Sequence, residues 1–307
     1  MSGQRYEKYS DEHFLTKTAL NLGQMILFKR INDLKKYIID SREANTTIGF
    51  VPTMGALHAG HLSLIRASKN SGYLTVCSIF VNPTQFNDPS DYQQYPITIE
   101  QDIRLLEQEN CDVLFMPDVQ EIYPPDHQKK QYRLGQLELY LEGKYRPGHF
   151  QGVCEVVDRL LDIVEPDLLF LGRKDYQQCM VIAELIRLTG KSTRLEIVPT
   201  MREPGGLAMS SRNLRLSEAD RKRAIAIYQT LQKIKTVIRP GEINQLSKEA
   251  SATLLEAGFS KVDYVSIAHA HSLAPVEYWD GKTPLVALAA AFLSGVRLID
   301  NISLTED

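Results

Sequence analysis

The fold is decided by residues 48–61, which read IGFVPTMGALHAGH. This stretch opens with the apolar run Ile48–Val51, turns through Pro52 and Gly55, and continues into a helical pattern. An apolar strand that passes through a tight turn into a helix is the repeating unit of parallel α/β sheets. We therefore expect a strand of such a sheet here.

The same pattern recurs along the chain. Further apolar runs alternate with helical stretches and lie at Thr75–Val81, Val113–Met116, Leu168–Leu171 and Leu195–Val198. This alternation favours a parallel sheet covered by helices. A helix is expected after Gly152, where a single apolar stripe contains Val153, Val156, Val157, Leu160, Leu161 and Val164.

The length of 307 residues favours about two domains. Residues 1–24 are polar and show no clear period, so they are interpreted as an N-terminal extension. The loop Arg202–Gly206 contains a proline and two glycines and precedes longer helical patterns. It therefore marks the predicted boundary between domains at residues 25–200 and 201–307.

The region after this boundary is also predicted to mix helices and strands. Ser217, with Asp220 three positions later, predicts the start of a helix that runs towards Val237, and Gly258 predicts the end of a second helix. A small sheet is expected from the apolar runs Val262–Ile267, Leu285–Phe292 and Arg297–Ile299.

The composition indicates an ordinary globular protein, with 43% hydrophobic and 24% charged residues. The net charge of −3 argues against a general binder of nucleic acid or of anionic membranes. The longest apolar stretch is too short to span a bilayer, and no signal pattern opens the chain, so we expect a cytoplasmic protein. The cysteines show no C-x-x-C spacing and are predicted to be reduced and buried; they are Cys77, Cys111, Cys154 and Cys179.

Two histidines lie where the helix after the run Ile48–Val51 is expected to begin. His58 and His61 are three positions apart, so they share a face of its first turn, beside backbone N–H groups. Gly60 lets a phosphate or ribose approach the backbone, and the helix dipole favours an anion. The motif therefore predicts a site for nucleotide phosphates. The alternatives are that the histidines only cap the helix or that they bind a metal, although no third ligand lies nearby in the sequence.

Polar residues also follow two other predicted strands. Asn82 and Gln85 follow the run that ends at Val81, and Lys174 and Asp175 follow the run that ends at Leu171. Ligands of open α/β sheets bind beyond the carboxyl ends of strands, so these are candidate ligand contacts, with the lysine facing a phosphate. The simpler alternatives are that Asn82 marks a turn and that Asp175 caps a helix.

Two loops complete the candidate site. In the glycine-rich loop 142–152, Arg146 is a candidate for a substrate carboxylate or pyrophosphate, whereas His149 is expected to be structural. The loop 206–213 brings Ser210, Ser211 and Arg212 to the presumed domain junction, where mobile loops can close over a nucleotide. The alternative for both loops is a solvated surface.

Five segments in this order resemble the pantothenate synthetase family, within the H-x-G-H nucleotidylyltransferases: PTMGALHAGH at 52–61, FVNPTQF at 80–86, RPGHFQGV at 146–153, GRKDYQQ at 172–178 and GLAMSSRN at 206–213. The resemblance spans roughly Met25 to Asn301. It implies a Rossmann-like N-terminal domain, a smaller α/β C-terminal domain that acts as a lid, and a homodimer. It also implies ATP-dependent condensation of pantoate with β-alanine through a pantoyl-adenylate, with release of AMP and pyrophosphate.

The motifs also imply roles for particular residues. ATP contacts are expected from Met54, Gly55, His58, Gly60, His61, Gly172, Arg173, Lys174, Asp175, Met201, Met209, Ser210, Ser211 and Arg212. The catalytic candidates, expected to act mainly as donors to phosphate oxygens, are His61, which matches the family's catalytic histidine, His58, Lys174, Ser210, Ser211 and Arg212. The substrate-binding candidates are Pro52, Thr53, Asn82, Arg146, Gln178 and Gln85, and the family places pantoate against the two glutamines and β-alanine near Gln85.

One departure from the family pattern concerns Mg²⁺. The family commonly has an arginine and further acidic residues after Tyr95-Pro96, where this chain has Ile97 and Gln101. Asp102 remains the candidate group on the metal side.

Two other functions are compatible with an H-x-G-H motif. An enzyme that transfers a nucleotide to a phosphate-bearing acceptor would favour cationic groups where this chain has Gln85 and Gln178. A nucleotide-sensing module would not require both imidazoles and a second phosphate loop.

Overall fold

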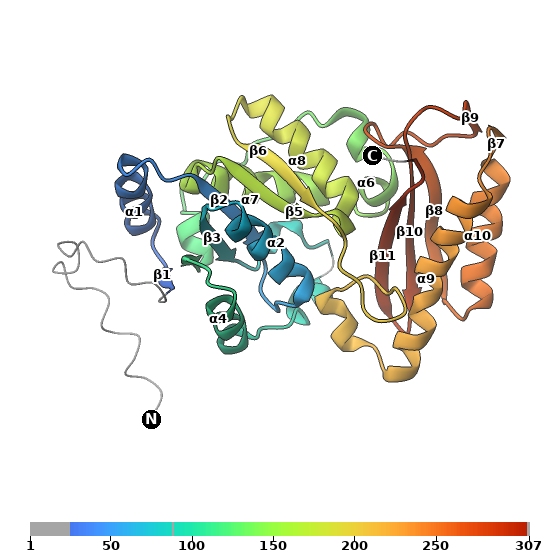
Figure 1. Cartoon of the computed structure of the whole chain (residues 1–307), viewed down its shortest axis with the longest axis horizontal. Helices are drawn as coiled ribbons and strands as arrows, with labels where there is room; N and C mark the ends of the chain where they lie inside the picture. Colours follow the sequence, from blue (N-terminus) through green and yellow to red (C-terminus); the bar gives the residue numbers. More distant parts are fainter. Residues whose placement is uncertain (1–24, 88, 306–307) are drawn as a thin grey trace.

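The apolar runs in the first half of the chain form a six-stranded parallel sheet (Figure 1). The computed structural model describes residues 25–87 and 89–305, so the predicted extension 1–24 lies outside the described residues. The elements of this half are β1 (Ile26–Phe28), α1 (Ile31–Glu43), β2 (Ile48–Thr53), α2 (Ala59–Asn70), β3 (Leu74–Ile79), the 3-10 turn η2 (Pro83–Gln85), α3 (Pro89–Gln93), α4 (Ile99–Gln108), β4 (Val113–Phe115), α5 (Val119–Ile122), η3 (Gly135–Glu138), α6 (Leu141–Tyr145), α7 (His149–Val164), β5 (Leu168–Gly172), η4 (Arg173–Asp175), α8 (Tyr176–Thr189) and β6 (Arg194–Val198).

The strand order places the topological switch point of the sheet between β2 and β5, beside the motif that contains His58 and His61. The order is β1-β4-β3-β2-β5-β6, so β3 and β4 extend to one side of β2 and β5 and β6 to the other. At such a switch point a crevice opens beyond the carboxyl ends of the two central strands. Here those ends are Thr53 and Gly172. Strand β1 was not expected, because it consists of three residues next to an unpatterned segment.

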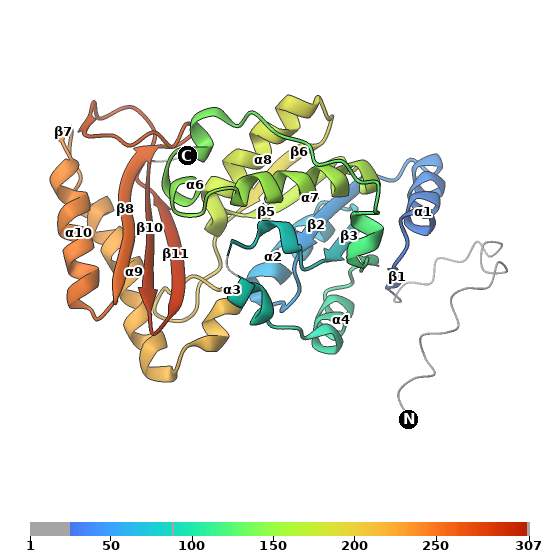
Figure 2. The same cartoon turned by 180° about the vertical axis from the view of Figure 1, so that it is seen from behind.

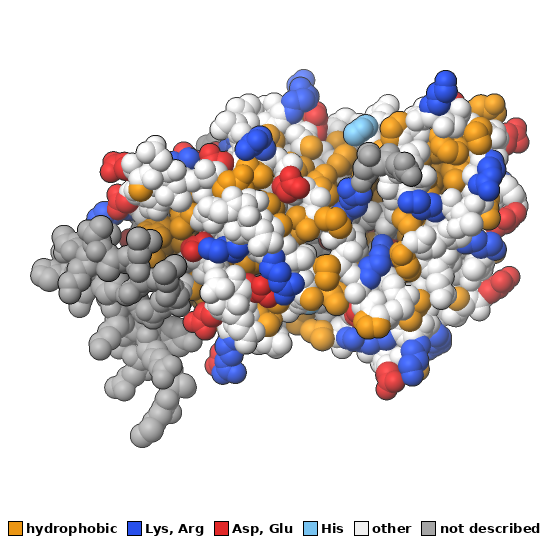
Figure 3. Space-filling view, in the orientation of Figure 1, with side chains coloured by type: hydrophobic (Ala, Val, Ile, Leu, Met, Phe, Trp, Pro, Cys, Tyr) orange, Lys and Arg blue, Asp and Glu red, His pale blue; other side chains and the backbone are white. Residues whose placement is uncertain are grey.

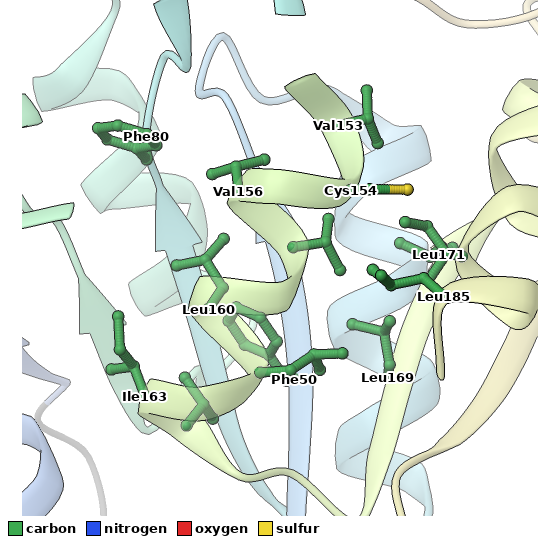
Figure 4. Packing of buried hydrophobic residues seen from close by; sticks show 14 of the residues in the cluster. Phe50, Phe80, Val153, Cys154, Val156, Leu160, Ile163, Leu169, Leu171 and Leu185 are labelled. Atoms are coloured by element: carbon green, nitrogen blue, oxygen red, sulfur yellow. The ribbon is translucent and has the colours of Figure 1, made fainter. Parts of the chain in front are cut away.

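The core of this half has two layers, which follow from the alternation of side chains along each strand. Phe50 of β2 lies in the cluster that contains the apolar stripe of α7, whereas the next residue, Val51, lies in the cluster formed with α2 and α4. Figure 4 shows α7 over the sheet, with Leu160 above Phe50. The predicted stripe of α7 is thus confirmed as a core-facing surface, and its helix ends at Val164.

The second half contains a three-stranded antiparallel sheet with strand order β11-β10-β8. The two long helices α9 and α10 pack on this sheet, on the outer side in Figure 1. The apolar run Leu285–Phe292 is its central strand. The elements are η5 (Ser211–Arg215), α9 (Glu218–Val237), β7 (Gly241–Glu242), α10 (Asn244–Glu256), β8 (Lys261–His269), β9 (Tyr278–Trp279), β10 (Leu285–Leu293) and β11 (Val296–Ser303).

The helix signals predicted in the second half are confirmed. The Ser217 hydroxyl accepts the Asp220 N–H and caps α9, which ends at Val237 as expected. Gly258 lies just beyond α10 with a φ of +93°, where glycine is favoured. The predicted division at residue 200 falls between the two sheets and stays a prediction.

A buried ion pair joins the two halves. Glu142 of α6 accepts two hydrogen bonds from Arg297 of β11, at 2.7 and 2.8 Å, and a third from the Tyr264 hydroxyl at 2.8 Å. Burial raises the pKa of Glu142, but hydrogen bonds and charge from Arg297 outweigh this effect and lower the pKa to about 2. Figure 2 shows α6 beside the C-terminal strands at this junction.

The charged surface and the buried cysteines are those of the ordinary globular protein that the composition indicated. Acidic and basic side chains both occur across the face in Figure 3. The four cysteines are buried and free, as predicted. Between residues 25 and 305, none of the helices combines the length and apolarity that a membrane crossing requires.

Candidate active site

The first turn of α2 orients His58. This residue is the N-cap, and its Nδ1 accepts the Gly60 N–H at 3.1 Å. A Cβ at position 60 would lie 2.8 Å from the His58 ring, so glycine allows the ring to fold back over the helix start. Because Nδ1 is the acceptor, the proton of the neutral ring is on Nε2, which remains available as a donor.

His61 stacks on His58. The ring centroids are 4.1 Å apart with an interplanar angle of 29°, so the predicted shared face is confirmed. Within the described chain, the buried Nδ1 of His61 has no hydrogen-bond partner. Burial lowers the pKa of His58 to about 4 and that of His61 well below its usual value, and Lys174 adds to both shifts. Both rings are therefore neutral near pH 7.

The contacts of His58 bear on two expectations from the sequence, the free N–H groups beside the motif and the choice between capping and ligand binding. The N–H of Gly60 is occupied by His58, so this one of the backbone N–H groups expected beside the motif is not free for a ligand. Capping was the alternative to a role in binding, but His58 caps the helix through one nitrogen and still lines the cavity.

Asp102 supports the turn before α2. Its two carboxylate oxygens accept the N–H groups of Ala56 and Leu57 at 2.9 and 2.8 Å, and the side chain is 1% exposed. Since both oxygens already accept hydrogen bonds from the protein, this geometry does not fit a direct ligand of Mg²⁺. In the described part of the chain, no three His, Cys, Asp or Glu residues are grouped to hold a metal. Among residues 25–87 and 89–305, the alternative that His58 and His61 form a metal site therefore lacks a third ligand in space as well as in sequence.

The carboxyl end of β5 brings Lys174 to the same crevice. The Lys174 ammonium lies 3.3 Å from the neighbouring carboxylate of Asp175. The backbone carbonyls of Arg173 and Lys174 accept hydrogen bonds from the buried Asn301 amide at 2.9 and 2.8 Å. A residue of β11 therefore holds this phosphate-loop candidate in place from the other half of the molecule.

The turn η2 carries Gln85 to the opposite wall. Its backbone carbonyl accepts Nδ1–H of His149 at 2.8 Å, and its side-chain Nε2 lies 3.0 Å from the sulfur of Met54. With Nδ1 as the donor, Nε2 of His149 accepts from Arg146 at 3.0 Å. Burial lowers the pKa of His149 to about 4, and the nearby Arg146 adds to this shift. The expectation that His149 is structural therefore agrees with its contacts.

The loop 209–212, which follows the last strand of the parallel sheet, also lines the site. The Ser211 hydroxyl lies 3.3 Å from the Tyr95 hydroxyl, and Arg212 donates to Asp91 at 2.7 Å. The guanidinium is therefore already paired in this state.

These walls enclose one cavity of about 1240 Å³, including its solvent-open part. The residues that line the cavity include Pro52, Thr53, Met54, His58, Gly60, His61, Asn82, Gln85, Tyr95, Gly172, Lys174, Asp175, Gln178, Thr200, Met201, Met209, Ser210, Ser211 and Arg212.

Comparisons with known proteins agree with this arrangement. The family model described as pantoate-beta-alanine ligase matches residues 26–303. The chain belongs to this family. Among curated relatives, the pantothenate synthetase of Methylococcus capsulatus is 46% identical over 278 residues, covering 90% of this chain and 96% of that protein. The protein of the same name from Thermotoga petrophila is 42% identical over 279 residues, covering 90% and 99%.

Solved structures of family members share the fold. A pantothenate synthetase structure from Thermus thermophilus aligns with a TM-score of 0.84 at 36% identity, covering 92% of this chain and all of that one. A pantoate-beta-alanine ligase structure from Francisella tularensis, described as complexed with beta-gamma ATP and beta-alanine, aligns with a TM-score of 0.76 at 36% identity, covering 92% and 99%. These likenesses confirm the predicted α/β fold with a smaller C-terminal part.

Most of the candidate site residues in this member of the pantoate–β-alanine ligase family line the main cavity. The four that do not are Gly55, Asp102, Arg146 and Arg173. Gly55 lies in the turn held by Asp102, and Arg173 offers its backbone to Asn301. Arg146 lines a neighbouring cavity of about 390 Å³, including its solvent-open part, between the two halves of the chain; this cavity shares Lys174, Asp175 and Gln178 with the main one.

Several wall residues were not identified from the sequence. Val153, Val156, Val157 and Leu160 of α7 line the cavity, although their periodicity indicated only a core stripe. Thr200 also lines it, with a buried hydroxyl that has no partner within the described chain. These four valine and leucine residues belong both to the core cluster and to the cavity wall, so their periodicity carries no separate signal for the cavity.

Proposed function

We propose that this chain catalyses the ATP-dependent condensation of pantoate with β-alanine to pantothenate, through a pantoyl-adenylate, with release of AMP and pyrophosphate. Family membership and the relative described with beta-gamma ATP and beta-alanine support the reaction. The observation that carries the proposal is that the stacked imidazoles and Lys174 share a cavity with two uncharged amides, Gln85 and Gln178. Amides suit a hydroxy acid better than a phosphorylated acceptor.

The proposed reaction has two steps. A carboxylate is a poor acceptor for an amine, so its oxygen first attacks the α-phosphorus and pyrophosphate leaves. The amine of β-alanine then displaces AMP at the acyl carbon. Neutral His58 and His61 would donate N–H groups to phosphate oxygens, and Lys174 would supply positive charge as the negative charge shifts to pyrophosphate.

The loop with Ser210, Ser211 and Arg212 would complete the phosphate contacts. Since Arg212 is paired with Asp91 in this state, its engagement requires exchange of a carboxylate for a phosphate. We also propose that Mg²⁺ enters with the triphosphate, because Asp102 does not fit as its direct ligand. Residence in the cytoplasm and a homodimer stay predictions.

The test is pyrophosphate release with pantoate, in the presence and absence of β-alanine. We expect limited release without the amine and continuous turnover with it. His61→Ala should lower the rate of adenylate formation by about 10²–10³, the usual effect of losing one well-placed donor. The matched control is His271→Ala, at an exposed turn of the second half. Normal turnover in the His61 variant would refute its role.

A further inference from the structure

The amide of Asn82 is held in one orientation by five hydrogen bonds. Its Oδ1 accepts the Thr84 N–H at 3.3 Å, the Thr84 hydroxyl at 3.1 Å and the Tyr123 hydroxyl at 3.0 Å. Its Nδ2 donates to the Gly152 carbonyl at 3.1 Å and to Oε1 of Gln85 at 3.2 Å. The backbone N–H can only donate and the carbonyl can only accept, so a flipped amide would lose both bonds.

This orientation determines which end of Gln85 is offered to a substrate. Because Oε1 of Gln85 accepts from Asn82, its NH₂ group is turned the other way, towards Met54 and the cavity. Gln85 therefore presents a hydrogen-bond donor. Carboxylate and hydroxyl oxygens are the complementary groups, and pantoate carries both. Asn82, predicted as a substrate contact, is 1% exposed and uses its side-chain nitrogen and oxygen within the protein.

Tyr123 lies outside the cavity lining and ends this chain of hydrogen bonds. It follows α5, and its ring packs near Phe80 and His127, with centroids 6.2 and 5.1 Å away. Burial raises its pKa to about 12, so the hydroxyl keeps its proton at neutral pH. Without this donor, Oδ1 of Asn82 would depend on the Thr84 residue alone.

We propose that Tyr123 is a positioning residue that sets the affinity for pantoate by fixing, through Asn82, the donor orientation of Gln85. The inference rests on the proposed function, because pantoate is taken to be the ligand of Gln85. It assigns a substrate effect to a hydroxyl that does not reach the substrate.

The test is Tyr123→Phe, which removes only the hydroxyl. We expect KM for pantoate to rise about fivefold to tenfold, as for the loss of one hydrogen bond, and KM for ATP to stay within about twofold. The matched control is Tyr132→Phe, which removes another hydroxyl, bound at 2.8 Å to Asp158 on α7. It should lower thermal stability and leave both KM values unchanged.

A Gln85→Ala background separates the possible failures. There, Tyr123→Phe should have no further effect on KM for pantoate, since its target is gone. If Gln85→Ala raises this KM while Tyr123→Phe does not, the positioning role is overturned and the substrate contact stands. If Gln85→Ala leaves it unchanged, the proposed contact fails and the inference fails with it.

Discussion

The backbones of α7 and of the turn that carries Gln85 approach each other closely at Gly152, and this allows a sharp prediction. A Cβ at Gly152 would lie 2.3 Å from the Thr84 carbonyl oxygen and 2.9 Å from the Gln85 nitrogen. Both neighbours are backbone atoms, so neither can move aside as a flexible side chain would. Gly152→Ala must therefore displace the turn or the helix.

The displacement can be estimated. Close carbon–oxygen contacts lie at about 3.3–3.6 Å, so the two elements must separate by about 1 Å. Such overpacking costs about 1–3 kcal/mol, and alanine in a helix recovers about 1 kcal/mol relative to glycine. The net loss of stability is therefore at most about 2 kcal/mol. A misplacement of about 1 Å in a binding residue can nevertheless lower the rate about 100-fold.

We therefore expect Gly152→Ala to lower kcat/KM for pantoate by about 10² while the protein stays folded. Steady-state kinetics with thermal unfolding of the same samples measures both effects. The matched control is Gly49→Ala at the other end of β2, where a Cβ would lie 2.2 Å from the Ser68 hydroxyl. This control should lose stability without a comparable loss in kcat/KM. Wild-type kinetics in Gly152→Ala would show that the position of η2 does not control substrate binding.

Two further predictions concern carboxylates. Asp102→Asn should raise KM for ATP several-fold and cost about 1–3 kcal/mol of stability, because its amide NH₂ group would face an N–H of Ala56 or Leu57. Titration with ATP would detect the change in KM, and an unchanged KM would contradict a role of Asp102 in shaping the turn. Glu142→Gln should cost about 1.5–3 kcal/mol at pH 7, because Arg297 keeps its pairing with Asp263 but loses the carboxylate that accepts two of its hydrogen bonds. The pKa of Glu142 in the folded protein is lowered from 4.5 to about 2, so the extra stability of the wild type over the variant should be complete above about pH 5 and disappear as the pH falls towards 2. Chemical unfolding of both proteins at several pH values tests this. A difference in unfolding free energy that does not change with pH would contradict it.

Much of the local structure could be predicted because its causes lie within a few residues. The run Ile48–Val51 forms a buried strand, and the spacing of His58 and His61 within one helical turn brings their rings together. The polar residues after β3 and β5 reach one crevice because parallel strands end at the same edge of a sheet. The order of the five motifs was sufficient to indicate the family, which the comparisons confirm.

Other features depend on partners that are distant in the sequence. Asp102 supports a turn 46 positions away, and Glu142 pairs with an arginine 155 positions away. Neither pairing has a local signal, and the family pattern after Tyr95-Pro96 suggested a metal-side role for Asp102 instead. The donor orientation of Gln85 likewise requires Asn82, Gly152 and Tyr123 to meet, from three separate elements.

The sequence by itself determined the type of each main element, the chemistry of the motifs and the edge of the sheet at which they meet, because periodicity, capping and strand direction act over short distances. Only the tertiary structure decided which polar groups remain free for a ligand. Each buried donor or acceptor must find a partner, and that partner is set by the packing of the whole fold.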